Sequence, residues 1–133
     1  LSGLGTERAW LVHGSDGIDE ITTTGPTHVA ELKDGKVRRF EVTPADAGLA
    51  QAQAADLKGG DAEANAGAIH ALLGGQHGPY RDIVLLNAAA ALVVAGRTDD
   101  LKAGVVRAAA AIDDGSAHRA LQRLVAITNE KAA

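Results

Sequence analysis

The sequence predicts an α/β fold, in which a few strands with a β-hairpin are followed by three to four helices. Short runs of apolar and β-branched residues occupy residues 7–43, and helix-forming segments with capping residues occupy residues 61–128. Alanine makes up roughly a fifth of the chain and aromatic residues only 2%, so the core must consist of Leu, Val and Ile with close Ala contacts. We expect one domain portion over residues 1–133.

The strand part contains three signals. Residues 9–12 form an apolar run that suits a buried strand, and residues 18–24 predict a weaker strand because they are rich in β-branched side chains. Residues 27–32 and 37–42 flank an Asp34-Gly35 pair, which is a strong signal for a tight hairpin turn. Because this hairpin carries several Lys and Arg residues, we expect an exposed, peripheral ribbon with a solvated basic face.

The helical part begins after a loop with a possible helical turn at 45–55. Asp61 is placed to cap a helix over residues 62–73, and Pro79 sits where the first residue of a second helix belongs. The second helix is apolar on every face between residues 83 and 94, which predicts burial on all sides.

Two further helices are expected near the end of the chain. Asp99-Asp100 opens one that runs to about residue 113, and Ser116 is placed to cap another that runs to about residue 127. A fully buried second helix needs more partners than these elements supply. The chain therefore looks like the second half of a domain.

Composition excludes several classes of protein. The chain has no cysteine, so it has no disulfide framework, Cys-ligated zinc or thiol nucleophile. The formal charge of −4 argues against nucleic-acid binding, because there is no basic surplus to neutralise phosphates. No apolar run approaches the ~20 residues of a membrane span, and the first residues do not resemble a signal peptide. We expect a cytoplasmic protein that binds neither membrane nor nucleic acid.

The strongest candidate for chemistry is an acidic segment directly after the first strand, Asp16-Gly17-Ile18-Asp19-Glu20. Ligands of α/β sheets gather at the carboxyl ends of strands, and carboxylate oxygens suit Mg²⁺. Spacing alone also fits an acidic loop that is merely solvated. Adjacent residues on a regular strand point to opposite faces, so two neighbouring carboxylates can serve one metal only where the backbone departs from a strand.

Other polar residues favour structural roles. The five histidines show no metal-binding spacing, and His13 is best explained as a hydrogen-bonded structural residue. The segment Lys58-Gly59-Gly60-Asp61 could present backbone N–H groups to an anion, but we favour a plain loop-to-helix junction, which needs no ligand. Asn87 lies inside an apolar helix and must find hydrogen-bond partners there. Neighbouring backbone is favoured over a substrate.

Taken in order, several segments resemble the anthranilate phosphoribosyltransferase family from about residue 7 to residue 124. They are His13-Gly14 with Gly17-Ile18-Asp19-Glu20, Thr24-Gly25-Pro26-Thr27, Leu57-Lys58-Gly59-Gly60-Asp61 with Asn65-Ala66, and Gly78 to Leu92 with Ala95-Gly96. The last segment is the longest and the most specific. The order of all four makes a coincidence improbable.

The resemblance implies a nucleoside phosphorylase/phosphoribosyltransferase-type α/β domain and a step of tryptophan biosynthesis. Such enzymes transfer phosphoribosyl from phosphoribosyl pyrophosphate to anthranilate and release pyrophosphate, usually as homodimers. By motif, Asp19 and Glu20 would be the Mg²⁺ ligands, and Asp16 would be a neighbouring loop residue. The attacking amine belongs to anthranilate, so no protein nucleophile is required.

The chain also departs from the family pattern. The family's Gly-Thr-Gly-Gly-Asp phosphate loop, its Lys-His-Gly-Asn segment and its anthranilate-binding arginine precede the region covered here. We therefore expect a carboxyl-terminal portion that is inactive alone and depends on a missing amino-terminal part. The alternative is a non-catalytic relative on the same scaffold, acting as a nucleic-acid-binding or interaction protein.

Overall fold

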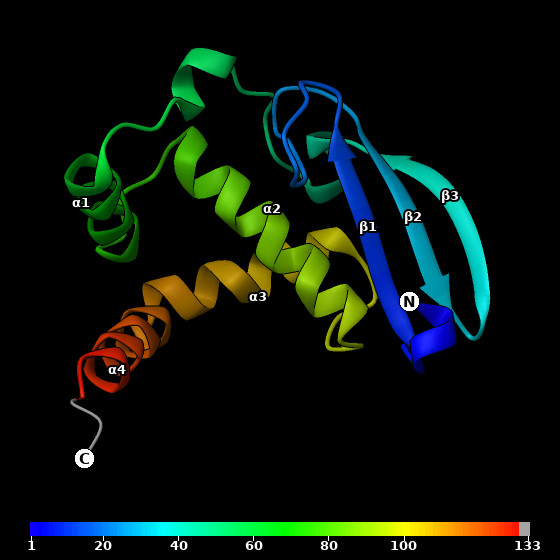
Figure 1. Cartoon of the computed structure of the whole chain (residues 1–133). Helices are drawn as coiled ribbons and strands as arrows, with labels where there is room; N and C mark the ends of the chain where they lie inside the picture. The colour runs from blue at the N-terminus through cyan, green and yellow to red at the C-terminus, as the bar shows by residue number, and fades with distance from the viewer. Residues whose placement is uncertain (131–133) are drawn as a thin grey trace.

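The computed structural model describes residues 1–130, so residues 131–133 of the expected domain portion lie outside the described residues. Within this range, an antiparallel sheet of three strands precedes four α-helices (Figure 1). The strands, in sheet order, are β1 (Arg8–Gly14), β2 (Thr27–Lys33) and β3 (Lys36–Val42). The helices are α1 (Ala62–Leu73), α2 (Pro79–Val94), α3 (Leu101–Asp113) and α4 (Ser116–Asn129).

The predicted hairpin forms, but it is not peripheral. Asp34 and Gly35 both adopt positive φ, 51° and 71°, as the tight turn between β2 and β3 requires. Strand β2 pairs with β1 as well as with β3, so it is the central strand of the sheet. Thr27 and Val29 of this strand are buried. The expected exposed ribbon is therefore wrong for β2, because its inner face is covered by the helical part.

The loop and helix predictions hold, with two corrections. Short 3₁₀ turns occupy Pro44–Ala47 and Ala54–Leu57, in the expected loop region. Ser116 is the first residue of α4 and not its cap; its backbone N–H donates to Asp114 Oδ1, and its hydroxyl donates to the carbonyl of Ala111. Helix α2 is not buried on every side, because Ala91 is exposed.

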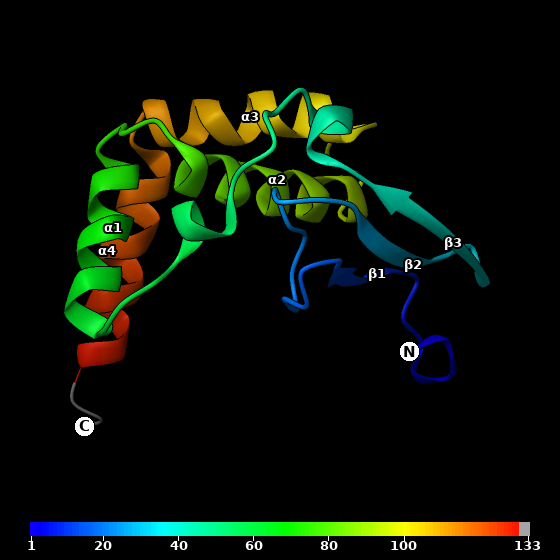
Figure 2. The same ribbon diagram turned by 90° about the horizontal axis from the view of Figure 1, so that it is seen from above.

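Helix α2 lies between the sheet and α3 (Figure 2). Towards the sheet, Leu86, Ala90 and Val93 pack with Ile21 and with the inner-face residues of the strands. Towards α3, Leu85 packs in a second cluster with Ala108 and Ile112. The two apolar clusters on opposite sides explain why this helix carries hydrophobic side chains around most of its circumference.

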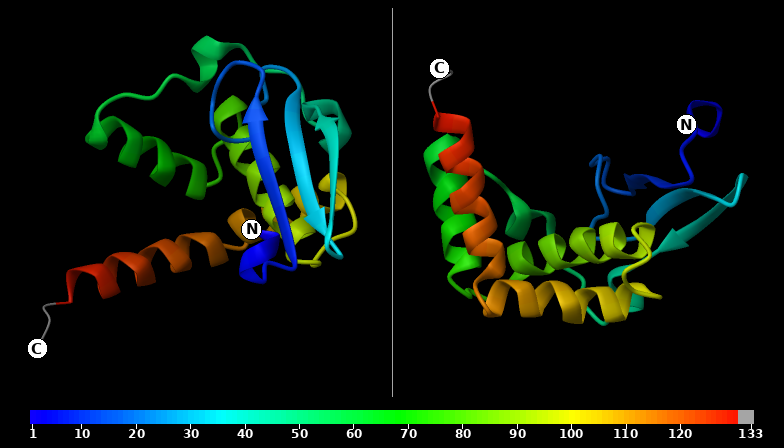
Figure 3. Two further views of the ribbon diagram at one scale, coloured as in Figure 1. Left: turned by 45° about the vertical axis from the view of Figure 1, so that its right-hand side comes forward. Right: turned by 90° about the horizontal axis from the view of Figure 1, so that it is seen from below.

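Helices α1 and α4 stand at the end of the α2–α3 layer that is far from the sheet (Figures 1 and 3). No residue of α4 is buried, although the helix carries Leu124, Val125 and Ile127. The apolar side of α4 is thus left without a covering partner within the described residues. None of the described helices is both long and apolar enough to cross a membrane.

Helices α2 and α3 approach each other closely at Gly104. A Cβ added there would lie 2.7 Å from the Cβ of Ala89 and 2.8 Å from its Cα, well inside contact distance. Since the obstructing atoms belong to the backbone and first side-chain carbon of α2, the crossing can admit a larger residue only if a helix shifts. The requirement at this position is for small volume, because Gly104 has helical backbone geometry.

We therefore expect Gly104→Ala to lower the free energy of unfolding by about 1–3 kcal/mol, the usual cost of overpacking a core. Gly67→Ala is the matched control, because Gly67 lies inside α1 with no atom near the position of its Cβ. That control should raise stability by about 0.5–1 kcal/mol through helix propensity alone. Urea unfolding of both variants checks the pair; equal effects would contradict the tight crossing.

A buried carboxylate joins all three strands on the inner face. Glu31 is only 5% exposed, and it lies between its cross-strand neighbours Trp10 and Arg38. Trp10 Nε1 donates to Glu31 Oε1 at 2.8 Å, and Arg38 Nε donates to the other carboxylate oxygen. Burial raises the pKa of Glu31, but the hydrogen bonds from Arg38 and Trp10 and the charge of Arg38 outweigh burial and lower that pKa below its ordinary value. Arg38 is therefore more than part of a solvated basic face.

The lowered pKa has a consequence for stability against pH. Glu31 contributes its stabilisation fully above its unfolded pKa, and this contribution is lost as pH falls through the lower folded pKa. We expect Glu31→Gln to cost about 1–2 kcal/mol at pH 7, with the difference from wild type shrinking in the acid range. Urea unfolding between pH 3 and pH 7 measures it.

Glu41→Gln is the control for this experiment. Glu41 pairs with His28 on the exposed face of the sheet, where both side chains are more than half exposed. The change should alter stability by less than about 0.5 kcal/mol at pH 7. A Glu31→Gln effect that is equally small, or that grows as pH falls, would contradict the role assigned to the carboxylate.

Candidate functional site

The acidic segment lies in the irregular connection between β1 and β2. Asp19 and Glu20 occupy a bend, and both side chains are exposed. The backbone thus departs from a regular strand at these two residues, as is required if two neighbouring carboxylates are to bind one metal ion. Among the described residues, neither carboxylate accepts a hydrogen bond or forms an ion pair. Both are therefore free to bind a ligand from solution.

Asp16 has a different role from the two acids that follow it. Its Oδ2 accepts hydrogen bonds from the hydroxyls of Thr22 and Thr24, both at 2.7 Å, and its Oδ1 accepts a longer one from the N–H of Ile18. Burial raises the pKa of Asp16, but these hydrogen bonds outweigh burial and lower that pKa. Asp16 therefore organises the connection and stays outside the free pair, as expected for a loop residue.

The threonines explain why the strand predicted over residues 18–24 does not form. The N–H of Thr22 donates to Thr27 Oγ1 at 3.0 Å, and the N–H of Thr24 donates to Thr22 Oγ1 at 2.9 Å. Side-chain oxygens thus take the backbone donors that a neighbouring strand would otherwise satisfy. The sequence signal that could have revealed this arrangement is the run of three threonines six residues after Asp16.

Asn87 ties the connection to helix α2. Its Oδ1 accepts a hydrogen bond from the N–H of Ile21 at 2.9 Å, and its Nδ2 donates to the carbonyl of Ile21 at 2.8 Å. The same Nδ2 donates to the carbonyl of Ile83, one turn earlier in α2, at 3.0 Å. The prediction that Asn87 binds neighbouring backbone is confirmed. The partner is the residue that directly follows Glu20.

The donor set of the acid pair fits Mg²⁺. This ion commonly takes one or two protein carboxylates and completes its shell with waters and substrate phosphates. Asp19 and Glu20 offer two exposed carboxylates without protein partners. Residues 1–130 hold no cluster of three or more His, Asp or Glu side chains suited to a metal ion. The chain would therefore supply part of a coordination shell, and phosphate oxygens and water the rest.

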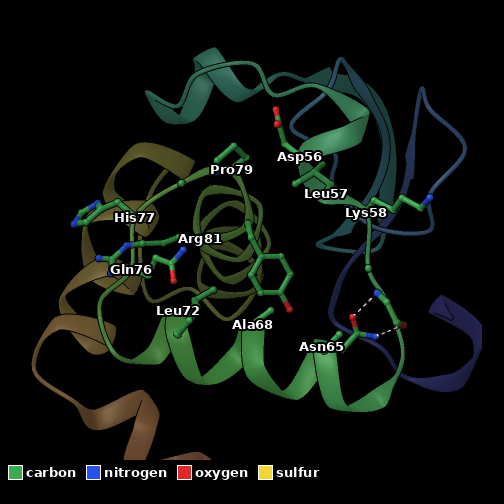
Figure 4. Close-up of a pocket in the computed structure, with 16 residues that line it drawn as sticks. Asp56, Leu57, Lys58, Asn65, Ala68, Leu72, Gln76, His77, Pro79 and Arg81 are labelled. Atoms are coloured by element: carbon green, nitrogen blue, oxygen red, sulfur yellow. Dashed lines mark hydrogen bonds between the residues drawn. The ribbon is translucent and has the colours of Figure 1, made fainter.

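A cavity of about 330 Å³ lies apart from the acid pair, between residues 56–60, α1 and the start of α2 (Figure 4). At its edge, Asn65 Oδ1 accepts from the N–H of Gly60 and Asn65 Nδ2 donates to the Gly60 carbonyl. Asp61 caps α1 by accepting from the N–H of Ala64. These contacts use the N–H of Gly60 inside the protein, which supports the plain loop-to-helix junction over an anion site.

The histidines do not join the acid pair in a metal cluster within the described residues. His28 pairs with Glu41, and His70 and His118 approach each other with ring centroids 6.4 Å apart. His13 is exposed, and its imidazole makes no hydrogen bond to any described residue. The expected hydrogen-bonded role of His13 is therefore wrong.

Comparison with known proteins agrees with this architecture. The model of the glycosyl transferase family, a/b domain, matches residues 1–118. The chain is 65% identical to an anthranilate phosphoribosyltransferase of Rhodospirillum rubrum over 127 residues, which cover 96% of this chain and 37% of the relative. It is 64% identical to the enzyme of that name from Azospirillum brasilense, over 97% of this chain and 36% of the relative. The chain thus spans little more than a third of these curated relatives.

Solved structures give the same result. The anthranilate phosphoribosyltransferase of Thermus thermophilus matches 94% of this chain with a TM-score of 0.83 and 39% identity, and 36% of that enzyme is covered. The enzyme of that name from Saccharomyces cerevisiae, solved in complex with PRPP and Mg, matches 86% of this chain with a TM-score of 0.78 and 25% identity, and 33% of it is covered. Because the family model covers most of its length, the chain belongs to the glycosyl transferase family as part of its α/β domain.

Proposed function

We propose that the chain is the carboxyl-terminal portion of an anthranilate phosphoribosyltransferase of tryptophan biosynthesis. The complete enzyme would transfer phosphoribosyl from phosphoribosyl pyrophosphate to anthranilate and release pyrophosphate. The similarity that runs along nearly the whole chain carries this proposal. The yeast relative solved with PRPP and Mg adds that a member of this group binds both.

Within this function, Asp19 and Glu20 would hold Mg²⁺ near the pyrophosphate. Breaking the bond between ribose and pyrophosphate builds negative charge on the leaving group, and a divalent cation bound there would stabilise that charge. The exposed, unpartnered state of both carboxylates supports the assignment. Asp16, already occupied by two threonine hydroxyls, would keep the bend in shape and stay away from the ion.

The remaining parts of the activity would come from the amino-terminal part that the longer relatives possess. The phosphate loop and the anthranilate contacts of the family do not occur in this sequence. The missing part would also cover surfaces that are open here, such as the free edge of β1 and the apolar groove between β1 and α2, lined by Trp10, Val12, Ala90 and Val94. The homodimer expected from the family stays a prediction.

A chimera tests the enzymatic proposal. In it, all 133 residues of this chain replace the matched region of the Rhodospirillum rubrum relative. We expect this chimera to convert phosphoribosyl pyrophosphate and anthranilate in the presence of Mg²⁺, because the graft restores the family's complete length. The 133-residue chain alone should show no turnover in the same assay. A folded chimera without turnover, or an active isolated chain, would contradict the proposal.

The same chimera tests the acid pair. We expect Asp19→Asn and Glu20→Gln each to lower kcat/KM at least 10–100-fold, about the range known for residues that support metal ligands. The Mg²⁺ concentration for half-maximal activity should rise as well, since each change removes one negative ligand. Glu63→Gln, an exposed change on α1, is the control and should leave activity intact. If both acid variants showed unchanged Mg²⁺ dependence, Asp19 and Glu20 would not be ligands of the metal.

The isolated chain should self-associate. Its open strand edge and its uncovered apolar surfaces, including Leu124 and Ile127 on α4, favour contact with other copies. Light scattering after size-exclusion chromatography should therefore give a native mass well above the 13.5 kDa of one chain. A monodisperse monomer with a sharp thermal transition would show that the chain needs no amino-terminal part for folding.

A further inference from the structure

The side-chain amide of Asn87 binds both polar groups of a single residue in another element. It accepts from the N–H of Ile21 at 2.9 Å and donates to the carbonyl of Ile21 at 2.8 Å, which we call the Asn87 clamp. The N–H of Ile21 belongs to the peptide bond between Glu20 and Ile21. Because a peptide bond is planar, the clamp fixes the orientation of the unit that carries the Cα of Glu20.

Among the described residues, no hydrogen bond or ion pair holds the side chains of the acid pair, so the backbone on either side must position them. Before the pair, the carbonyl of Ile18 accepts a hydrogen bond from the N–H of Gly14 at 3.0 Å. After the pair, the Asn87 clamp holds Ile21, which is 1% exposed. The first anchor is local to the connection. The second joins the acid pair to helix α2, the most deeply packed helix of the fold.

The chemistry of the clamp selects asparagine. An aliphatic side chain would leave the N–H and C=O of Ile21 without partners at a buried position, which is costly. An aspartate could accept from the N–H but could not donate to the carbonyl. The second N–H of the Asn87 amide is used as well, by the carbonyl of Ile83. Both N–H donors are therefore engaged by backbone carbonyls and the amide oxygen by the N–H of Ile21, so the whole amide holds backbone.

We propose that Asn87 is a positioning residue, which presets the Glu20 carboxylate for Mg²⁺ by fixing the Glu20–Ile21 peptide unit. The proposal rests on the proposed metal role of Asp19 and Glu20. Metal ligands act well only when neighbouring contacts hold them within about 0.5 Å of their working geometry. The Asn87 clamp supplies that support from α2, so the position of the metal site is set by the packing of the helix.

The test measures Mn²⁺ binding to the chimera by electron paramagnetic resonance, with the metal alone as the probe. We expect Asn87→Ala to raise the Kd for Mn²⁺ about tenfold or more, the usual effect of losing support around a metal ligand. In a Glu20→Gln background, Asn87→Ala should cause no further rise, because the residue that it positions is gone. A merely structural residue would not show this dependence on Glu20.

Asn65→Ala is the matched control. Asn65 binds the N–H and the carbonyl of Gly60 in the same two-point pattern, but at the start of α1 and away from the acid pair. It should lower thermal stability and leave the Mn²⁺ Kd unchanged. If Asn87→Ala does not fold, Asn87→Ser replaces it, because serine loses the same amide but can still bond to its own helix.

Three results would overturn the inference. The Mn²⁺ affinity could be unchanged in Asn87→Ala but reduced in Glu20→Gln. That result would rule out the positioning role of Asn87 and would still support the proposed metal site. An equal loss of affinity in Asn65→Ala would show that general loosening is the cause. Unchanged affinity in Glu20→Gln would overturn the metal role of Glu20, and with it any positioning of that residue by Asn87.

Discussion

The packing of helix α2 between the sheet and α3 is the constraint on which the rest of the structure depends. One side of the helix buries Leu86, Ala90 and Val93 against the sheet side, and the other buries Leu85 against α3. Between residues 83 and 94 of this helix, a single polar residue interrupts the apolar surface. Asn87 points its amide at Ile21, so the helix that builds the core also fixes the connection that carries the acid pair. Core and candidate site therefore share one element.

The connection between β1 and β2 shows how an irregular segment can be rigid. Such a segment cannot use a strand neighbour for its backbone groups, yet Ile21, Thr22 and Thr23 are each at most 1% exposed. Side chains satisfy these groups instead. Asn87 and Thr27 accept hydrogen bonds from the N–H groups of Ile21 and Thr22, and Asp16 accepts from the hydroxyls of Thr22 and Thr24. Most buried polar groups here are satisfied, as folded proteins require. The exposed carboxylates of Asp19 and Glu20 take no part in these hydrogen bonds.

The sequence predicted what local rules determine and missed what tertiary contacts determine. Asp61 as a cap, Pro79 at a helix start and Asp34-Gly35 in the hairpin turn all obey local backbone chemistry, and the structure confirms them. The strand expected over residues 18–24 failed because β-branched threonines were used as hydrogen-bonding groups. The peripheral hairpin failed because strand order depends on pairing partners distant in sequence. For the candidate site, the sequence identified Asp19 and Glu20, but their exposure and the hydrogen bonds of Asn87 to the adjacent Ile21 depend on the fold.

The distribution of contacts suggests how the complete enzyme would divide its work. The bend around the acid pair is organised by hydrogen bonds made within this chain, namely by Asp16, the threonines and Asn87. Open surfaces lie on the β1 edge, on α4 and in the groove beside α2, which is lined in part by Ile21 and Asn87 themselves. An amino-terminal part that covered these surfaces would not need to build the bend that carries the acid pair, because the bend is already formed. It would bring the substrate contacts to a preorganised pair of carboxylates, which is the arrangement that makes electrostatic stabilisation of a leaving group effective.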